Sequence, residues 1–276
     1  MTVSQSFSLA GRTAIVTGAA GLLGRRHCQA VAQAGARVVA TDLDLAGCQY
    51  LVAELGGDAF AVEADLCCRD SLRKLADTVL ERCGRIDVLV NNAAINDKVE
   101  APGTGLETSR FENYPLDHWQ RALDANLTAP FLCCQVIGAE MARLGAGSII
   151  NLGSTYGLVA PDQSLYRDLD GDQRFYKSPV YPATKSALLG LTRFLAAYSG
   201  AAGVRVNALS PGGVKNAQDD CFVAEYSRRT PLGRMAQPTD FMGALVFLAS
   251  DASLYVTGAN QESDFPARNC ALVTAA

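Results

Sequence analysis

The feature that most constrains this chain is a glycine-rich turn between a short apolar segment and a helical segment near the start. Residues 13–18 read TAIVTG, glycines follow at positions 18, 21 and 24, and residues 22–34 have the spacing of a helix with one packed face. A strand, a glycine turn and a helix in this order place unpaired N–H groups of the helix N-terminus where a phosphate can bind. The segment therefore predicts a nucleotide-binding α/β unit.

The same alternation continues along the chain. Apolar runs rich in Val and Ile predict strands at 37–42, 59–65, 86–92, 147–153 and 204–210 and a last short strand after Thr257-Gly258; segments of helical period lie at 44–55, 69–83, 116–144, 181–200 and 238–250. This order predicts an α/β protein: a single-domain Rossmann fold over residues 1–276, with a doubly wound parallel sheet and helices on both faces. Ligands of such sheets bind outside the carboxyl ends of the strands, so substrate loops are predicted at about 96–114, 158–180 and 214–231.

Composition excludes several classes of partner. The 24 basic and 28 acidic residues give a net charge of −4 with no long basic run, which argues against nucleic acid. No secretory signal and no uninterrupted apolar stretch long enough for a bilayer are recognised, so we expect a cytoplasmic protein without a membrane partner. Nine cysteines, an odd number, are expected to be reduced thiols, and with only His27 and His118 no metal site is predicted.

The second predicted strand ends in an acidic residue. Asp42 follows Gly18 by 24 residues, near the spacing at which a carboxylate reaches the adenosine ribose of a dinucleotide. A carboxylate there would repel a 2′-phosphate, so NAD is favoured over NADP. Arg25 and Arg26 are counter-evidence, although a solvated helix face explains them as well. Asp42 could instead be the N-cap of the following helix.

A tyrosine and a lysine four residues apart lie on one face of the helix predicted at 181–200. A free phenol has a pKa near 10, and a nearby ammonium favours the phenolate, so Tyr181 beside Lys185 could exchange a proton with an alcohol or carbonyl oxygen. Such a pair alone is weak evidence, because any helix can carry one. Tyr156, Tyr166 and Tyr176 compete with Tyr181, but none has a lysine four residues later.

The order of short motifs adds specificity. They are TGAAGLLG at 17–24, Asp65-Leu66, Asn91-Asn92-Ala93-Ala94, Asn126 in DANLTAPF, Ser154 in INLGSTYG, the Tyr181/Lys185 pair and Ser210-Pro211-Gly212-Gly213. From Gly11 to Gly258 the chain resembles the classical short-chain dehydrogenases/reductases. The glycine spacing by itself is that of the extended branch of this superfamily, but the later motifs and the short chain assign it to the classical branch.

The resemblance implies roles for individual residues. Tyr181 would be the general acid/base, Ser154 would bind the reacting oxygen, Lys185 would lower the pKa of Tyr181 and bind the nicotinamide ribose, and Asn126 would hold a water in the proton path. Ser154 could also be a plain strand-end hydroxyl, and Asn126 could cap or kink its helix. Cofactor contacts are implied for Gly18, Gly21, Leu22, Leu23, Gly24, Asp42, Leu43, Asp65, Leu66, Asn92, Ala93, Ala94, Tyr181, Lys185, Pro211, Gly212 and Val214. A homodimer or homotetramer through the helices at 116–144 and 181–200 is also implied.

Two segments depart from the family pattern. Between Ser154 and Tyr181 lie 26 residues, roughly twice the usual number, so 158–180 is read as a polar insertion over the substrate site. The C-terminus lacks the usual Asp-Gly-Gly; Asp264 could stand for its Asp, but Phe265-Pro266 replaces the glycines. This puts the last strand in doubt.

The motifs together predict an NAD-dependent oxidoreductase that interconverts an alcohol and a ketone or aldehyde on a small polar substrate, for which a sugar-derived compound is one option. The runs SRFENYPLDHW and APDQSLYR also resemble a subgroup linked to bacterial surface-sugar biosynthesis, including legionaminic acid. One alternative is a 3-oxoacyl or cyclic ketone reductase that uses NADPH. Another is a catalytically inactive NAD-binding regulatory protein, which the intact set of four catalytic residues disfavours.

Overall fold

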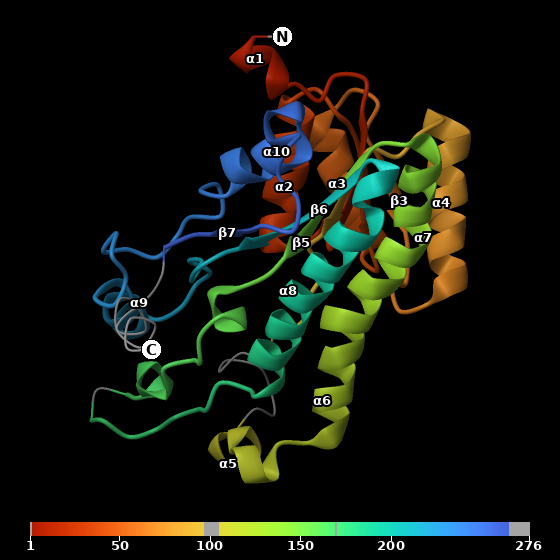
Figure 1. Cartoon of the computed structure of the whole chain (residues 1–276). Helices are drawn as coiled ribbons and strands as arrows, with labels where there is room; N and C mark the ends of the chain where they lie inside the picture. Colours follow the sequence, from red (N-terminus) through yellow and green to blue (C-terminus); the bar gives the residue numbers. More distant parts are fainter. Residues whose placement is uncertain (1, 97–104, 169, 265–276) are drawn as a thin grey trace.

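A computed structural model describes residues 2–96, 105–168 and 170–264. Seven parallel strands form one sheet in the order β3-β2-β1-β4-β5-β6-β7 (Figure 1). The sheet is doubly wound, because the order runs outward from β1 on one side and from β4 on the other, which confirms the predicted fold class. The strands are β1 (Thr13–Thr17), β2 (Arg37–Asp42), β3 (Phe60–Glu63), β4 (Val88–Asn91), β5 (Gly147–Leu152), β6 (Val204–Ser210) and β7 (Asn260–Glu262).

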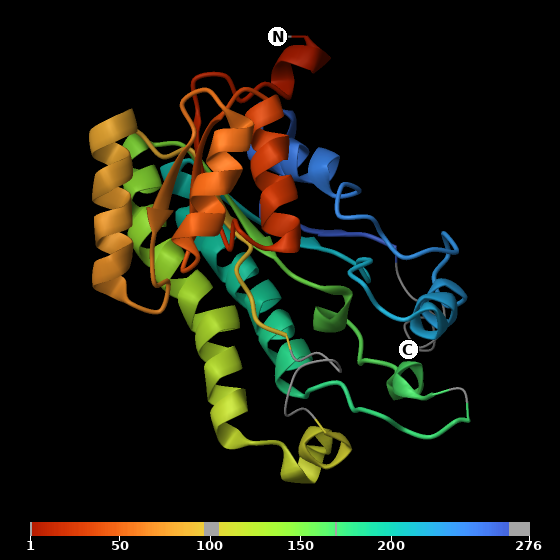
Figure 2. The ribbon, with the colours of Figure 1, turned by 180° about the vertical axis from the view of Figure 1, so that it is seen from behind.

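Helices cover both faces of the sheet (Figures 1 and 2). One face carries α2 (Leu22–Gln33), α3 (Leu45–Leu55) and α10 (Met242–Ala249), and the other carries α4 (Arg69–Cys83), α7 (Ala129–Leu144) and α8 (Val180–Ser199). The remaining α-helices of the described residues are α1 (Val3–Ser6), α5 (Leu106–Ser109), α6 (Leu116–Leu123) and α9 (Asp220–Ser227). Of these, α5 lies at the bottom of Figure 1 and α9 to the left of the sheet, both on the side of the carboxyl ends of the strands.

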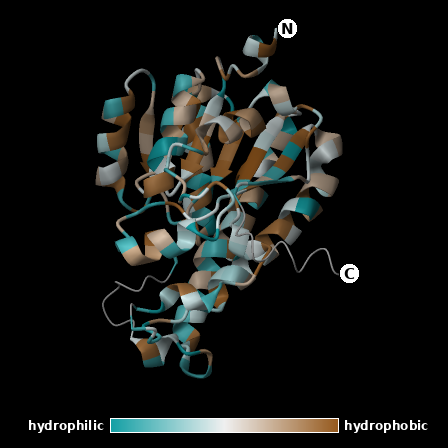
Figure 3. Cartoon of the chain, turned by 90° about the vertical axis from the view of Figure 1, so that its left-hand side faces the viewer, coloured by the Kyte–Doolittle hydropathy of each residue, from teal (hydrophilic) through white to brown (hydrophobic). Residues whose placement is uncertain are grey.

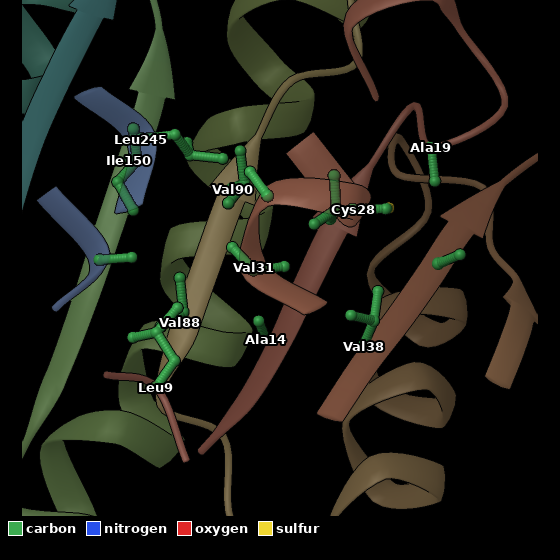
Figure 4. Packing of buried hydrophobic residues seen from close by; sticks show 14 of the residues in the cluster. Leu9, Ala14, Ala19, Cys28, Val31, Val38, Val88, Val90, Ile150 and Leu245 are labelled. Atoms are coloured by element: carbon green, nitrogen blue, oxygen red, sulfur yellow. The ribbon is translucent and has the colours of Figure 1, made fainter. Parts of the chain in front are cut away.

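Two apolar clusters, one on each face of the sheet, make up the core. Within β1, Ala14 and Val16 belong to the cluster under α2 and α10, and Ile15 belongs to the cluster under α4 and α7. Figure 4 shows the first cluster, where Val31 of α2 packs over Ala14 and Val88. Because both faces are covered, the central strands are apolar at nearly every position, as their brown colour in Figure 3 shows.

The long helix predicted at 116–144 consists of three parts. Between α6 and α7 lies one π-helical turn, Asp124–Thr128. By length and mean hydropathy the stretch Leu116–Leu144 could cross a membrane, a test that a buried core helix passes as well. Because α7 packs against α4 and β5, the structure accounts for it as a covering helix of the sheet.

The C-terminal edge also differs from expectation. β7 pairs with β6 in parallel although the family glycines are missing, because Ala208, Leu209 and Ser210 align with residues 260–262 through the backbone. Phe265-Pro266 lies outside the described residues. α10 begins four residues later than predicted, and neither α5 nor α9 was predicted.

Candidate active site

The glycine turn after β1 is closely packed on its neighbours. Gly18 has a φ of +62°, and a Cβ there would lie 2.7 Å from the Cα of Ala93. A Cβ on Gly24 would collide with the carbonyl oxygen of Gly18. Gly21 is the N-cap of α2 and offers no side chain to the first N–H groups of the helix. These features fit a dinucleotide pyrophosphate at the helix N-terminus.

Asp42 lies beside this turn, at the end of β2. Its Oδ2 accepts a hydrogen bond from the backbone N–H of Ala20 at 3.1 Å, and its Oδ1 accepts one from the N–H of Asp44 at 3.2 Å. The N-cap of α3 is Asp44, which accepts from Gly47 N at 2.9 Å, so the N-cap alternative for Asp42 is wrong. Arg25 is half-buried and donates from Nε to the Ala20 carbonyl at 3.1 Å, so it is not simply part of a solvated face.

The segment after β4 is tied to the glycine turn. Asn92 Nδ2 donates to the carbonyl oxygens of Thr17 at 2.9 Å and Gly18 at 3.1 Å, and the N–H of Ala93 donates to Thr17 Oγ1 at 3.1 Å. At the end of β3, Asp65 is exposed and accepts from Cys67 N at 2.9 Å. The residues predicted to contact the cofactor therefore follow β1, β2, β3 and β4 at one edge of the sheet.

Ser154, Tyr181 and Lys185 come together although 26 residues of sequence lie between the first and the second. Ser154 follows β5, and its side chain is hydrogen-bonded to Tyr181, the second residue of α8. Lys185 lies one turn further on, where its Nζ donates to the carbonyl oxygen of Leu152 at 2.6 Å and lies 5.7 Å from the centroid of the Tyr181 ring. The motif spacing thus places all three side chains at the end of β5.

Burial governs the ionisation of this group. It raises the pKa of Tyr181, and the hydrogen bond to Ser154 offsets only part of that effect. Burial also lowers the pKa of Lys185 to about 8. We expected Lys185 to lower the pKa of Tyr181; the net shift is upward, because the loss of water around the phenolate outweighs the favourable contacts.

Asn126 is buried in the π-helical turn between α6 and α7. Its Oδ1 accepts from Ile95 N at 2.8 Å, and its Nδ2 donates to Ile95 O at 2.9 Å. Asn126 therefore holds the backbone that follows β4, and it lies within a π-helical turn that joins α6 to α7. Its predicted role in holding a water stays a prediction.

A cavity of about 830 Å³ opens between the end of β5, α8, α9 and the segment 158–180. Ser154, Tyr181 and Lys185 lie in its wall. Of the predicted cofactor contacts, its wall also includes Leu22, Leu23, Asn92, Ala94, Pro211, Gly212 and Val214. The other predicted residues lie outside this wall: Gly18, Gly21, Gly24, Asp42, Leu43, Asp65, Leu66, Ala93 and Asn126.

Aromatic side chains form the far wall of the cavity. Tyr166 contacts Phe175 and Phe222, each with ring centroids 5.7 Å apart, and Phe222 stacks on Tyr226 at 6.0 Å. Tyr156 lines the cavity as well, whereas Tyr176 does not. Two of the three competing tyrosines therefore line the pocket without a lysine one turn away.

Helix α9 is fixed to its surroundings by two side chains that sequence reasoning missed. Arg229, 8% exposed, donates to Asp162 Oδ2 at 3.1 Å and to Ser164 Oγ at 3.0 Å in the inserted segment. The hydroxyl of Tyr226 accepts from Gly213 N at 2.6 Å. The four-residue spacing of Phe222 and Tyr226 was the available signal for α9, and Arg229 follows two residues after the end of that helix.

Known proteins share this arrangement. The family model described as Enoyl-(Acyl carrier protein) reductase matches residues 18–265. The chain is a classical short-chain dehydrogenase/reductase. This dehydrogenase is 35% identical over 268 residues to D-threitol dehydrogenase of Mycolicibacterium smegmatis, which covers 94% of each chain. It is 37% identical over 252 residues to 3-alpha-(or 20-beta)-hydroxysteroid dehydrogenase of Mycobacterium bovis, which covers 91% of this chain and 87% of the relative.

A solved structure of another dehydrogenase also superposes on this chain. A putative NAD(P) dependent gluconate 5-dehydrogenase from Beutenbergia cavernae with bound NADP superposes with a TM-score of 0.78 at 36% identity, over 93% of this chain and 96% of that one. The dehydrogenase is accordingly an NAD(P)-dependent oxidoreductase that acts on CH–OH groups, as the sequence predicted.

Proposed function

We propose that this dehydrogenase interconverts a secondary alcohol and a ketone of a small polyhydroxylated, sugar-derived compound, with NAD as cofactor and Tyr181 as general acid/base. The observation that carries the proposal is the meeting of Ser154, Tyr181 and Lys185 in one cavity whose outer wall is a polar insertion. The roles follow from chemistry: a phenol held by a serine hydroxyl can exchange a proton with the substrate oxygen that the serine also binds.

The direction of the pKa shift at Tyr181 has a consequence for this proton transfer. Because burial raises its pKa, the hydroxyl is protonated at neutral pH and ready to donate to a ketone oxygen. Oxidation of the alcohol needs the phenolate, so its rate should rise with pH. Lys185 keeps a cation near the ring, and Asn126 holds the loop after β4 in place.

The glycine turn, Asp42 and the Asn92-Ala93-Ala94 segment would hold the dinucleotide, with Lys185 at the nicotinamide ribose. When bound, NAD supplies the hydride acceptor or donor. The Asp42 carboxylate at the end of β2 supports NAD over NADP, because it would repel a 2′-phosphate. The relative from Beutenbergia cavernae carries NADP, so NADP is the competing cofactor.

The substrate class rests on two features. The insertion contributes polar side chains to the cavity wall, among them Arg167, Asp170 and Arg174. The similarity to D-threitol dehydrogenase and to a putative gluconate 5-dehydrogenase also supports a polyol or sugar substrate. A cyclic or 3-oxoacyl ketone is the second candidate, which the aromatic wall and the hydroxysteroid relative favour. The resemblance to surface-sugar enzymes stays a prediction.

Steady-state rates test both points. The purified enzyme is assayed with NAD and NADP on polyols, sugar acids, acyl thioesters and alicyclic alcohols, and the highest kcat/KM should fall on a polyhydroxylated substrate with NAD. Tyr181→Phe should lose nearly all turnover and still bind NAD. Unchanged turnover in Tyr181→Phe would refute the mechanism, and a wild type that binds NAD but turns over no substrate would favour the regulatory alternative.

We further propose a single domain with substrate loops at 96–114, 158–180 and 214–231, in a cytoplasmic homodimer or homotetramer. Stacked and exposed rings support assembly through α8: Phe194 and Tyr198 lie on its outer face with ring centroids 6.0 Å apart. Size-exclusion chromatography with light scattering measures the number of subunits, and a monomer would refute this part.

A further inference from the structure

A tyrosine on α9 joins the turn after β6 to the segment after β5. Tyr226 is 4% exposed, and its hydroxyl oxygen accepts a hydrogen bond from the N–H of Gly213 at 2.6 Å. Its side chain is also hydrogen-bonded to that of Thr155, the residue after Ser154. Resting on the function proposed above, we propose that Tyr226 is a positioning residue for the nicotinamide: its hydroxyl holds the turn 211–214, and the ring bound there, beside the catalytic serine.

The two segments that Tyr226 joins are neighbours across the sheet. β5 and β6 pair in parallel, so the segments that follow them leave the sheet side by side. The N–H of Thr155 donates to the carbonyl oxygen of Pro211 at 3.1 Å. Both segments line the cavity that holds Tyr181. A nicotinamide bound by the turn would therefore lie next to the catalytic side chains, and a shift of the turn would move it away from them.

Other hydrogen bonds hold the turn outside the cavity. Gly212 N donates to Ser263 Oγ at 2.6 Å, and Ala236 N donates to the carbonyl oxygen of Gly213 at 2.9 Å. Tyr226 lines the cavity, whereas Ser263 and Ala236 lie outside its wall. The Tyr226 hydroxyl is therefore the contact that fixes the turn on the side where the nicotinamide would bind.

The ring of Tyr226 is itself held in place. It stacks on Phe222 with ring centroids 6.0 Å apart, and it fills the space that a side chain at Gly213 would need. Burial raises the pKa of its hydroxyl, which stays protonated at neutral pH and can accept one hydrogen bond while it donates another. A positioning group that is already ordered loses little freedom when the ligand binds, which favours affinity.

Two matched ligands test the proposal. NADH and ADP-ribose share the adenosine, the pyrophosphate and the second ribose, but only NADH carries the nicotinamide ring. Tyr226→Phe removes the hydroxyl and keeps the ring of the side chain. It should raise the Kd of NADH by about 5- to 10-fold, as the loss of one hydrogen bond predicts, and change the Kd of ADP-ribose less than about twofold. Isothermal titration calorimetry measures both values.

A second variant and a control complete the test. Thr155→Val removes the hydroxyl that bonds to Tyr226; it should also weaken NADH, and it should add little to Tyr226→Phe because both break the same link. Tyr255→Phe changes an exposed tyrosine outside the cavity wall and should leave both Kd values unchanged. ADP-ribose binding and thermal unfolding show whether each variant is folded, and Thr155→Val carries the test if Tyr226→Phe does not fold.

The possible results separate this inference from the proposed function. If Tyr226→Phe weakens NADH and ADP-ribose equally, or weakens neither, the inference fails and the proposed function stands. If wild type binds neither ligand, the proposed function itself fails. If wild type binds NADPH in place of NADH, the same difference in Kd is measured with NADPH and 2′-phospho-ADP-ribose, and its absence there overturns the inference.

Discussion

Replacement of the buried Lys185 should make the protein more stable and inactive. Its pKa falls from 10.5 to about 8 on burial, a difference of about 2.5 that corresponds to about 3 kcal/mol in favour of the unfolded chain at neutral pH. Lys185→Met keeps the length of the side chain and removes the charge. It leaves the buried carbonyl of Leu152 without its donor, which costs about 1–3 kcal/mol. The net gain is about 1 kcal/mol, or a Tm higher by about 2–4 °C.

The extra stability of Lys185→Met over wild type should decrease as the pH rises. Lys185 releases its proton near pH 8 in the folded chain and only near 10.5 in the unfolded chain, so wild-type stability rises with pH across this window. The Met variant lacks this contribution. Its advantage should therefore be full below pH 8 and shrink toward pH 10.5.

Urea unfolding followed by circular dichroism at pH 7 and pH 9.5 measures this difference, and Lys74→Met on the exposed face of α4 is the control. A Lys185→Met variant that is less stable than wild type at pH 7, or an advantage that does not change with pH, would refute the reasoning. The turnover of Lys185→Met should fall to background whatever its stability, while wild type and Lys74→Met stay equally active.

Two further predictions concern the part of the cavity wall that is formed by α9 and the segment 158–180. Gly213→Ala would push a methyl group into the ring of Tyr226 and displace α9, so kcat/KM for the alcohol should fall at least about tenfold. The control is Gly243→Ala on α10, where no atom lies within 4 Å of the added carbon. Its kcat/KM should stay within twofold of wild type. Arg229→Gln should lower the free energy of unfolding by about 2–3 kcal/mol and raise the KM of the alcohol about tenfold, without weakening NAD binding. Arg228→Gln, at the exposed neighbouring position, should change neither the free energy of unfolding nor KM. Equal effects of the two variants would contradict the role of Arg229.

Much of the fold could be predicted because its signals are local. The strands β1, β2 and β6 are apolar runs closed by turn residues, and their predicted bounds agree with the structure to within one residue. β7 was doubted because the family glycines are absent, yet a strand pairs through its backbone, and the N–H of Ser263 still reaches Ser210 O at 3.2 Å.

The catalytic residues could be predicted from the sequence, but the side chains of α9 and the segment 158–180 that enclose them could not. Ser154 and Tyr181 stand at fixed places relative to β5 and α8, so the sheet brings them together whatever the length of the loop between them. Tyr226 and Arg229 depend on contacts between segments far apart in sequence, such as Arg229 with Asp162. No periodicity or spacing records such a contact. The pKa of Tyr181 could not be predicted either, because the burial that raises it depends on segments far apart in sequence.

The π-helical turn at Asp124–Thr128 makes chain length in this region as important as residue identity. An α-helix turns by about 100° per residue, and a π turn takes up roughly one residue more than an α turn. α6 and α7 are therefore out of phase by one residue, and each presents its own face. Deletion of a single residue here would straighten the helix but rotate either Asn126 away from Ile95 or the apolar face of α7 away from the sheet. The turn and its two flanking helices form a unit that tolerates substitution better than a change in length.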